Sequence, residues 1–371
     1  MADAFSPEPD IGCDLMQIAA EKHRAGRLDR RTLLGCLMAL GGVATTGKAS
    51  AATGELVVVN FGGPAVAAFK AAFGPAYEKL TGLKLVIDGS GPLASKIRAM
   101  VQANQAVWDV CDTSTNSSLL LGKAGLLEPI DFDIVDKSKV LEGFALPYGV
   151  ANYTYSYVLS YNRKLLPAEP KSWADFWDRK RFPGKRIMSK TPGGQLEAAL
   201  LAAGVPRDRL YPLDLDLALR KIKEIKDDLI FWESGAQSMQ AFRDKEVVMG
   251  NIWHTRAALL LDEMKGDFTW TWNEGILNAS AWNIPKGNPA GRKAAMQFVA
   301  STQDPAQQAA LFVALASGPA NPATVSLIPP DLLFRDPMQP ANRQVQITSN
   351  PQWWADNNDR VADLWLDAIS G

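Results

Sequence analysis

Short apolar runs alternate with helical stripes from residue 55 to about residue 123, and this alternation constrains the fold more than any other feature of the chain. The runs at 55–60, 83–88 and 108–111 have the length and composition of strands that are buried on both faces. Between the first two runs, apolar side chains recur at three- and four-residue steps from Val66 to Leu80, as on one face of a helix. The repeated order strand, helix predicts an α/β lobe built on a mostly parallel sheet.

This pattern breaks at Leu146-Pro147-Tyr148-Gly149, and a second α/β region follows over about 163–270. We expect the chain to cross between two lobes near Tyr148 and again near Asn283. Lobe 1 is then 55–148 plus 282–320, and lobe 2 is 149–281 plus 321–371. In the first crossing strand, Tyr153, Tyr155 and Tyr157 alternate with small polar residues, so they share one face.

The first 52 residues have the order of an export signal. Arg30 and Arg31 precede a small, apolar run through Val43, and Ala49-Ser50-Ala51 supplies a small-x-small cleavage pattern. We predict a twin-arginine-like leader cleaved near Ala51 and a periplasmic location. The general secretory route and an amphipathic N-terminal helix of the folded protein are the alternatives.

Composition and motifs exclude several classes of function. Lys plus Arg is 39 and Asp plus Glu is 40, so the net charge of −1 argues against binding to nucleic acid or to an anionic membrane. Only Cys111 and His254 follow the leader among cysteines and histidines, so we expect neither a His/Cys metal site nor a thiol redox centre. The sequence carries no nucleophile elbow, Walker loop or dinucleotide-binding glycine motif. We therefore expect a protein that is not an enzyme and has no cofactor.

Small and polar residues follow each predicted strand of lobe 1. In open α/β sheets, ligands bind beyond the carboxyl ends of the strands. The sequence therefore predicts ligand contacts at Asn60, Phe61, Gly62, Ser90 and Thr113. Ordinary tight turns would explain each of these segments singly.

Lobe 2 offers a second set of candidates. Gly193, Gly194 and Gln195 lead into a helical run, where unpaired backbone N–H groups form an anion cradle. Arg256 follows Trp253 and His254, and an arginine fork binds a carboxylate through two parallel hydrogen bonds. Plain alternatives are a proline-containing turn for the glycines, a solvated arginine, a core tryptophan and a structural histidine.

Several segments, in this order and spacing, resemble the polyamine-type extracellular solute-binding proteins of ABC importers. They include FGGP after the first strand, then WDVCD, SWADFWDRKRFPGKR, VVMGNIWHTR and WNEGILNASAWNIPKG. The resemblance runs from about residue 55 to the end. It implies a type II periplasmic binding protein fold, with two α/β lobes joined by a two-strand hinge. It also implies a small ligand in the interlobe cleft, closure of the lobes around it, and delivery to a permease in the inner membrane. We expect a monomer.

One departure from these relatives bears on the ligand. They place aspartates before the Trp-x-Ile-Pro-Lys-Gly motif, whereas this chain has Asn-Ala-Ser-Ala at 278–281. A polyamine needs fixed negative charge when its water is stripped, and only Glu274 and Glu233 are nearby replacements. We therefore favour a small carboxylate or other organic anion, held by Arg256 and by hydroxyls such as those of Tyr153 and Ser280. Spermidine or putrescine is the alternative, and ferric ion held by tyrosines is the second.

Overall fold

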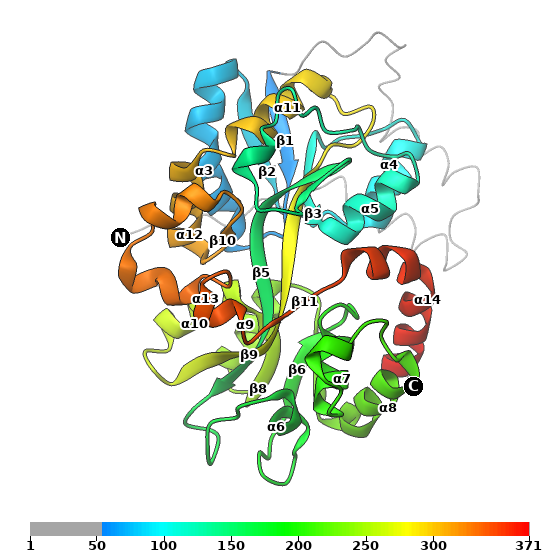
Figure 1. Cartoon of the computed structure of the whole chain (residues 1–371), viewed down its shortest axis with the longest axis vertical. Helices are drawn as coiled ribbons and strands as arrows, with labels where there is room; N and C mark the ends of the chain where they lie inside the picture. Colours follow the sequence, from blue (N-terminus) through cyan, green and yellow to red (C-terminus); the bar gives the residue numbers. More distant parts are fainter. Residues whose placement is uncertain (1–53, 371) are drawn as a thin grey trace, which may run out of the picture. The chain divides into compact units, whose positions relative to one another are not determined.

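The computed structural model describes residues 54–370, so the predicted leader lies outside the described residues. These residues build one sheet with the strand order β2-β1-β3-β9-β5-β8-β6-β7 (Figure 1). The prediction of an α/β fold is confirmed. No helix within the described range is long and apolar enough to cross a membrane.

Lobe 1 forms one end of this sheet. Its strands are parallel, as the alternating pattern predicted, and Leu56 and Val58 of β1 are fully buried. At the end of β1, Gly62 has φ 72° and approaches the carbonyl of Gly89 so closely that a side chain at Gly62 would collide with it. The elements are β1 (Glu55–Val59), α3 (Pro64–Thr81), β2 (Lys84–Asp88), α4 (Ala94–Gln102), β3 (Val110–Ser114), α5 (Thr115–Lys123), α11 (Gly291–Ser301) and α12 (Pro305–Leu315).

Lobe 2 forms the other end and has its own hydrophobic core. Strand β6 lies between β7 and β8 and is parallel to both. The elements are α6 (Trp173–Trp177), β6 (Arg186–Ser189), α7 (Gln195–Ala202), α8 (Leu215–Ile225), β7 (Leu229–Trp232), α9 (Gly235–Arg243), β8 (Met249–Trp253) and α10 (His254–Glu263).

Two long antiparallel strands, β5 (Gly149–Asn162) and β9 (Phe268–Asn283), join the lobes. Strand β9 pairs with β3 of lobe 1, while β5 pairs with β8 of lobe 2, so the sheet continues from one lobe into the other. The register between β5 and β9 shifts twice, between Ala151 and Tyr153 and between Tyr157 and Leu159. Strand β5 begins at Gly149 and β9 ends at Asn283, next to the two positions at which the sequence predicts crossings.

After α12 the chain touches the cores of both lobes within residues 315–319, which we call the crossing segment, and it returns to the core of lobe 1 at Ala320. Leu315 belongs to the hydrophobic core of lobe 1, whereas Ala316 belongs to that of lobe 2. Strand β10 (Gly318–Pro319) then pairs with β5. The short helix η4 (Pro322–Leu327) packs on α12 of lobe 1, whereas in η5 (Pro330–Arg335) the ring of Phe334 stacks on Trp270 of lobe 2.

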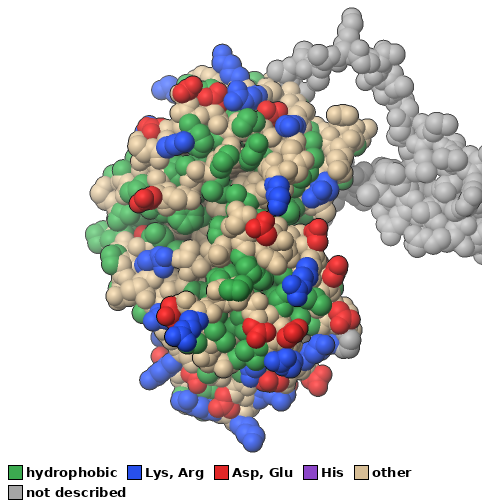
Figure 2. Space-filling view, turned by 45° about the vertical axis from the view of Figure 1, so that its right-hand side comes forward, with side chains coloured by type: hydrophobic (Ala, Val, Ile, Leu, Met, Phe, Trp, Pro, Cys, Tyr) green, Lys and Arg blue, Asp and Glu red, His purple; other side chains and the backbone are tan. Residues whose placement is uncertain are grey.

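The C-terminal helix α14 (Pro351–Ser370) contacts α5 of lobe 1 and α8 of lobe 2. Trp354 Nε1 donates to the buried Glu197 carboxylate at 2.8 Å, and Trp365 Nε1 donates to the Lys190 carbonyl at 2.7 Å. The remaining elements are β4 (Ala145–Leu146), α13 (Pro340–Arg343) and β11 (Ile347–Thr348), with short 3₁₀ helices at Lys137–Lys139, Arg207–Arg209 and Lys226–Asp228. Figure 2 shows cationic and anionic side chains interspersed over the face in view.

Candidate ligand-binding site

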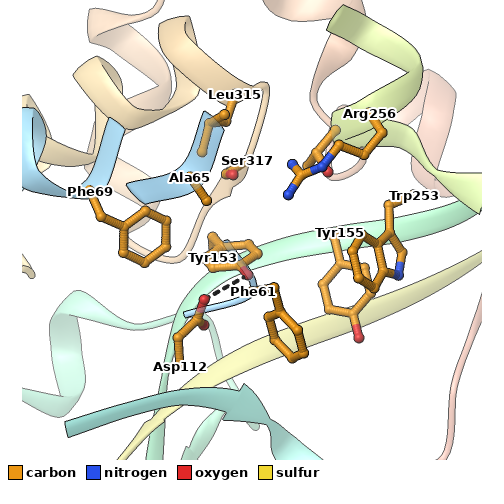
Figure 3. Close-up of a pocket in the computed structure, with 11 residues that line it drawn as sticks. Phe61, Ala65, Phe69, Asp112, Tyr153, Tyr155, Trp253, Arg256, Leu315 and Ser317 are labelled. Carbon is orange, nitrogen blue, oxygen red and sulfur yellow. Dashed lines mark hydrogen bonds between the residues drawn. The ribbon is translucent and has the colours of Figure 1, made fainter. Parts of the chain in front are cut away.

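Two adjoining cavities lie where the strand ends of lobe 1 meet lobe 2. The smaller, which we call the binding pocket, has a volume of about 40 Å³. The larger, which we call the outer cleft, has a volume of about 490 Å³ and shares Phe61, Tyr155 and Trp253 with it. The binding pocket is lined by Phe61, Ala65, Phe69, Asp112, Tyr153, Tyr155, Trp253, Thr255, Arg256, Leu315 and Ser317 (Figure 3). Both lobes, β5 and the crossing segment thus contribute to one pocket.

Arg256 is the cation of the pocket. It lies in the first turn of α10, is only 5% exposed, and reaches toward the pocket from the lobe 2 side (Figure 3). Its guanidinium forms no hydrogen bond or ion pair within residues 54–370, and its Nε is buried without a partner. Burial lowers the pKa of Arg256, although an arginine stays protonated in proteins. A buried, unpartnered guanidinium is costly, and an anion that paired with it would offset that cost.

Asp112 is the anion of the pocket and lies across it from Arg256, in the middle of β3 (Figure 3). Its carboxylate accepts hydrogen bonds from Asn152 Nδ2 at 2.9 Å, from the Tyr153 hydroxyl at 3.2 Å, and from the Ser280 hydroxyl. Burial raises the pKa of Asp112 to about 6, while these hydrogen bonds and the charge of Arg256 act in the opposite direction. Asp112 is therefore ionised at neutral pH, yet it forms no ion pair with Arg256.

Aromatic rings fill the space between and around the two charges. Tyr153 and Tyr155 share a face of β5, as predicted, with ring centroids 6.2 Å apart. Trp253 lies 6.3 Å from Tyr155 and 5.7 Å from Phe61, so an aromatic contact links the two lobes. Burial raises the pKa of Tyr153 and Tyr155 well above 10, and both phenols are neutral. Such rings suit the methylene chain of a solute and the face-on contact of a cation.

Of the residues that the sequence singled out, four line the binding pocket and four more line the outer cleft. The first four are Phe61, Tyr153, Trp253 and Arg256, and the other four are Ser90, Thr113, Gly193 and Glu233. Glu233 is exposed and forms an ion pair with Lys190 at 2.6 Å. The structure therefore gathers the candidates of both lobes at one cleft.

The lobe 1 and strand candidates outside both cavities support the backbone or Asp112. Asn60 Oδ1 accepts from Gly62 N at 2.9 Å, which shapes the turn after β1. Ser280 lies behind Asp112 and donates to it. Glu274 lies on β9, where its carboxylate accepts from Trp173 N at 2.9 Å.

The lobe 2 candidates outside both cavities are Gly194, Gln195 and His254. The N–H of Gly194 donates to the Glu197 carboxylate at 2.9 Å, and the N–H of Gln195 donates to the Pro192 carbonyl at 3.0 Å. These two groups are therefore not free to cradle an anion. His254 is fully buried and both of its ring nitrogens are bonded to the backbone.

Asp112 is the pocket residue that sequence reasoning most clearly missed. The predicted strand ends at residue 111, so Asp112 falls in the polar segment that follows it, but from that segment only Thr113 is predicted as a ligand contact. The hydroxyl of Thr113 instead donates to the side chain of Asn283. The signal available was a carboxylate directly after a predicted strand that is buried on both faces. Such a carboxylate is itself buried, and a buried carboxylate needs a partner.

A metal site is not apparent in the part of the chain that the structure describes. Within residues 54–370, no three His, Cys, Asp or Glu side chains gather closely enough to hold a metal ion. Tyr153 and Tyr155, which a ferric site would use as phenolates, have the raised pKa values described above.

Two lobes around a cleft, joined by shared strands, are the architecture of a solute-binding protein. A model of the bacterial extracellular solute-binding protein family matches residues 65–332, and the chain belongs to that family. It is the substrate-binding component of an ABC import system, as the sequence resemblance implied.

Individual relatives are similar over nearly their whole length. The gamma-aminobutyric acid-binding protein of Pseudomonas aeruginosa is 30% identical over 330 residues, covering 87% of this chain and 93% of that protein. The Atu4243 GABA receptor structure is 36% identical, with a TM-score of 0.78 over 85% of this chain and 98% of that one. An ABC transporter substrate-binding protein from Bradyrhizobium japonicum is 35% identical, with a TM-score of 0.79 over 85% and 99%.

Proposed function

We propose that this protein captures a small zwitterion with separated charges, an ω-amino acid such as 4-aminobutanoate. The observation that carries the proposal is the pair of buried, opposite charges, Arg256 and Asp112, that face one pocket without contacting each other. Arg256 binds the carboxylate through its fork, and Asp112 binds the ammonium group. One zwitterion neutralises both charges, whereas a simple anion or cation leaves one of them unpaired.

The pocket walls suit the rest of such a ligand. The rings of Tyr153, Tyr155 and Phe61 cover its methylene groups, and a ring face attracts its ammonium end. The ligands named for the two GABA-binding relatives support this class of solute. The sequence analysis favoured a small carboxylate as the ligand, and a carboxylate is one end of the zwitterion proposed here.

The cellular role follows from the family and the leader. The chain is exported by the twin-arginine-like signal, cut near Ala51, and works in the periplasm as a monomer. Ligand contacts from both lobes favour the closed form, which the inner-membrane permease then recognises. The solute leaves chemically unchanged, because the pocket holds it by charge and shape alone.

Polyamines fit the pocket less well. A dication would gain Asp112 but would lie beside the buried guanidinium of Arg256, and like charges in a dry site repel strongly. Putrescine is therefore the informative competitor of 4-aminobutanoate, because both are built on an unbranched four-carbon chain and differ in the charge at one end.

Isothermal titration calorimetry with four ligands tests the proposal. We expect 4-aminobutanoate to bind most tightly, and butanoate and butylamine each to bind at least tenfold more weakly, because each leaves one buried charge unpaired. Putrescine should bind more weakly than butylamine. Tighter binding of putrescine than of 4-aminobutanoate would refute the assignment.

A substitution of Arg256, the cation of the pocket, gives a second prediction. Arg256→Met should weaken binding of 4-aminobutanoate at least tenfold and raise the Tm of the ligand-free protein by about 2–4 °C, because an unpaired buried charge is removed. The matched control is Arg220→Met, since Arg220 is an exposed arginine on α8. An unchanged affinity in Arg256→Met would remove Arg256 from the site.

A further inference from the structure

His254 lies between two chain segments that line the binding pocket. Its sequence neighbours Trp253, Thr255 and Arg256 all line the pocket, and we call residues 253–256 the β8–α10 junction. Its Nε2 donates to the carbonyl oxygen of Ala316 at 2.8 Å. Ala316 lies in the crossing segment, and both of its neighbours also line the pocket. One hydrogen bond thus joins two walls of the site directly.

The other ring nitrogen fixes the tautomer that makes this bond possible. Nδ1 of His254 lies 3.0 Å from the backbone nitrogen of Ser156, whose N–H can only donate. Nδ1 must therefore be the acceptor, and Nε2 carries the proton that is given to Ala316. The bond to Ser156 also fixes the imidazole on β5, the strand that carries the tyrosines of the pocket.

The crossing segment needs such an anchor. It contacts the hydrophobic core of lobe 1 at Leu315 and that of lobe 2 at Ala316, and the chain is back in the core of lobe 1 at Ala320. Ala316 has φ 54°, a left-handed conformation that is unfavourable for a residue with a Cβ atom. Two residues further on, Gly318 packs so closely on Thr154 of β5 that a side chain there would collide with it. The segment is therefore held at two points, by His254 and by this close approach.

We propose that His254 is a positioning residue, which holds the crossing segment against the β8–α10 junction so that Ser317 and Arg256 face the same ligand. This role rests on the proposed function of the pocket. His254 does not touch the ligand, because it lines neither cavity. If His254 served stability alone, its replacement would change the free energy of unfolding. Variants that fold equally well would then bind the ligand with equal affinity.

Two amide substitutions separate the two hydrogen bonds of the imidazole. In His254→Gln, the longer side chain places its Nε2 near the position of the imidazole Nε2, so the bond to Ala316 is retained. In His254→Asn, the shorter side chain places Oδ1 near the position of Nδ1, so the bond to Ser156 is retained and the bond to Ala316 is lost. The pair thus forms a matched comparison at one position.

Calorimetric titration with 4-aminobutanoate is the first measurement. We expect His254→Asn to weaken binding at least tenfold and His254→Gln to stay within about threefold of the wild type, with thermal unfolding recorded for all three. Equal affinities in the two variants would overturn the positioning role. Failure of the wild type to bind 4-aminobutanoate would instead reject the proposed ligand.

Two measurements without ligand test the role independently. Hydrogen exchange by mass spectrometry should show faster exchange of residues 314–320 in His254→Asn than in the wild type or His254→Gln, and equal exchange in all three would overturn the proposal. The ¹⁵N imidazole spectrum of the wild type, assigned by the signal that is lost in His254→Gln, should show the Nε2–H tautomer. An Nδ1–H tautomer would overturn the proposal even if His254→Asn failed to fold.

Discussion

At the scale of single residues, Asp112 explains why this chain has no aspartate at 278–281. The negative charge comes from β3 instead, and Ser280, within the altered segment, donates a hydrogen bond to it. A carboxylate in the same segment would lie beside Asp112 and raise the cost of ionising both. With the departure at 278–281, the binding pocket thus has a single carboxylate opposite one arginine.

The pKa of Asp112 predicts how affinity depends on pH. Burial raises that pKa to about 6, so below pH 6 the ligand-free carboxyl takes up a proton and loses its attraction for an ammonium group. Affinity for 4-aminobutanoate should be constant from pH 7 to 8 and should fall by up to about tenfold per pH unit below 6. Titration calorimetry from pH 5 to 8 measures this dependence. Asp112→Asn should bind weakly at every pH, and a wild-type affinity that does not change over this range would contradict the prediction.

At the scale of elements, the sequence predicted the strand ends and Arg256 but not their partners. Periodicity locates β1, β2 and β3 because each is a local apolar run with a polar end. It does not show that Asp112 faces the cleft, because that depends on the pairing of β3 with β9, a contact across about 170 residues. The anion cradle at 193–195 was predicted from local chemistry alone. In the structure, the buried Glu197 carboxylate accepts a hydrogen bond from one of its N–H groups, that of Gly194.

Helix α9 sets the position of Arg256 through a glycine at its start. A methyl group on Gly235 would collide with Arg256 Nε, so Gly235→Ala should displace the guanidinium and weaken ligand binding about tenfold, with little loss of folding. Gly74→Ala in α3 is the control, because its new methyl group would meet only the flexible Lys70 side chain at 3.4 Å. Calorimetry and thermal unfolding of both variants test the difference. Equal affinity in the two would show that Arg256 does not depend on this packing.

At the scale of the whole molecule, the sequence predicted two lobes and the passages between them, the last after residue 320, whereas the contact of residues 315–319 with both cores and the bridging position of helix α14 were not foreseen. A break such as Leu146-Pro147-Tyr148-Gly149 is visible locally. The passage from Leu315 to Ala316 is not, since both residues are apolar and only packing assigns them to different cores. The final helix was predicted from its apolar stripe, but its contacts with both lobes arise from tertiary structure.

Two buried groups have opposite effects on the free energy of unfolding in acid. Burial lowers the pKa of His254 to about 4, so the unfolded chain takes up this proton first and the free energy of unfolding falls by about 3 kcal/mol from pH 6.5 to 4. The raised pKa of Asp112 acts with the opposite sign, because the folded state takes up its proton first.

Replacing Asp112 should therefore reveal the full pH dependence of stability that His254 causes. Between pH 6.5 and 4, urea unfolding of Asp112→Asn should show a loss of stability about 3 kcal/mol larger than that of the wild type. The double variant Asp112→Asn, His254→Gln should lose this extra dependence. Parallel stability curves for the wild type and Asp112→Asn would contradict the assignment of opposite signs.

The two register shifts between β5 and β9 lie on either side of the pocket tyrosines. Bulges are where an antiparallel ribbon bends and twists most readily. We therefore expect the connection between the lobes to bend at these two shifts and the stretch that carries Tyr153 and Tyr155 to keep its shape. On the proposed closure, a solute would contact the same aromatic surface of β5 on arrival and after capture, while the lobes on either side move toward it.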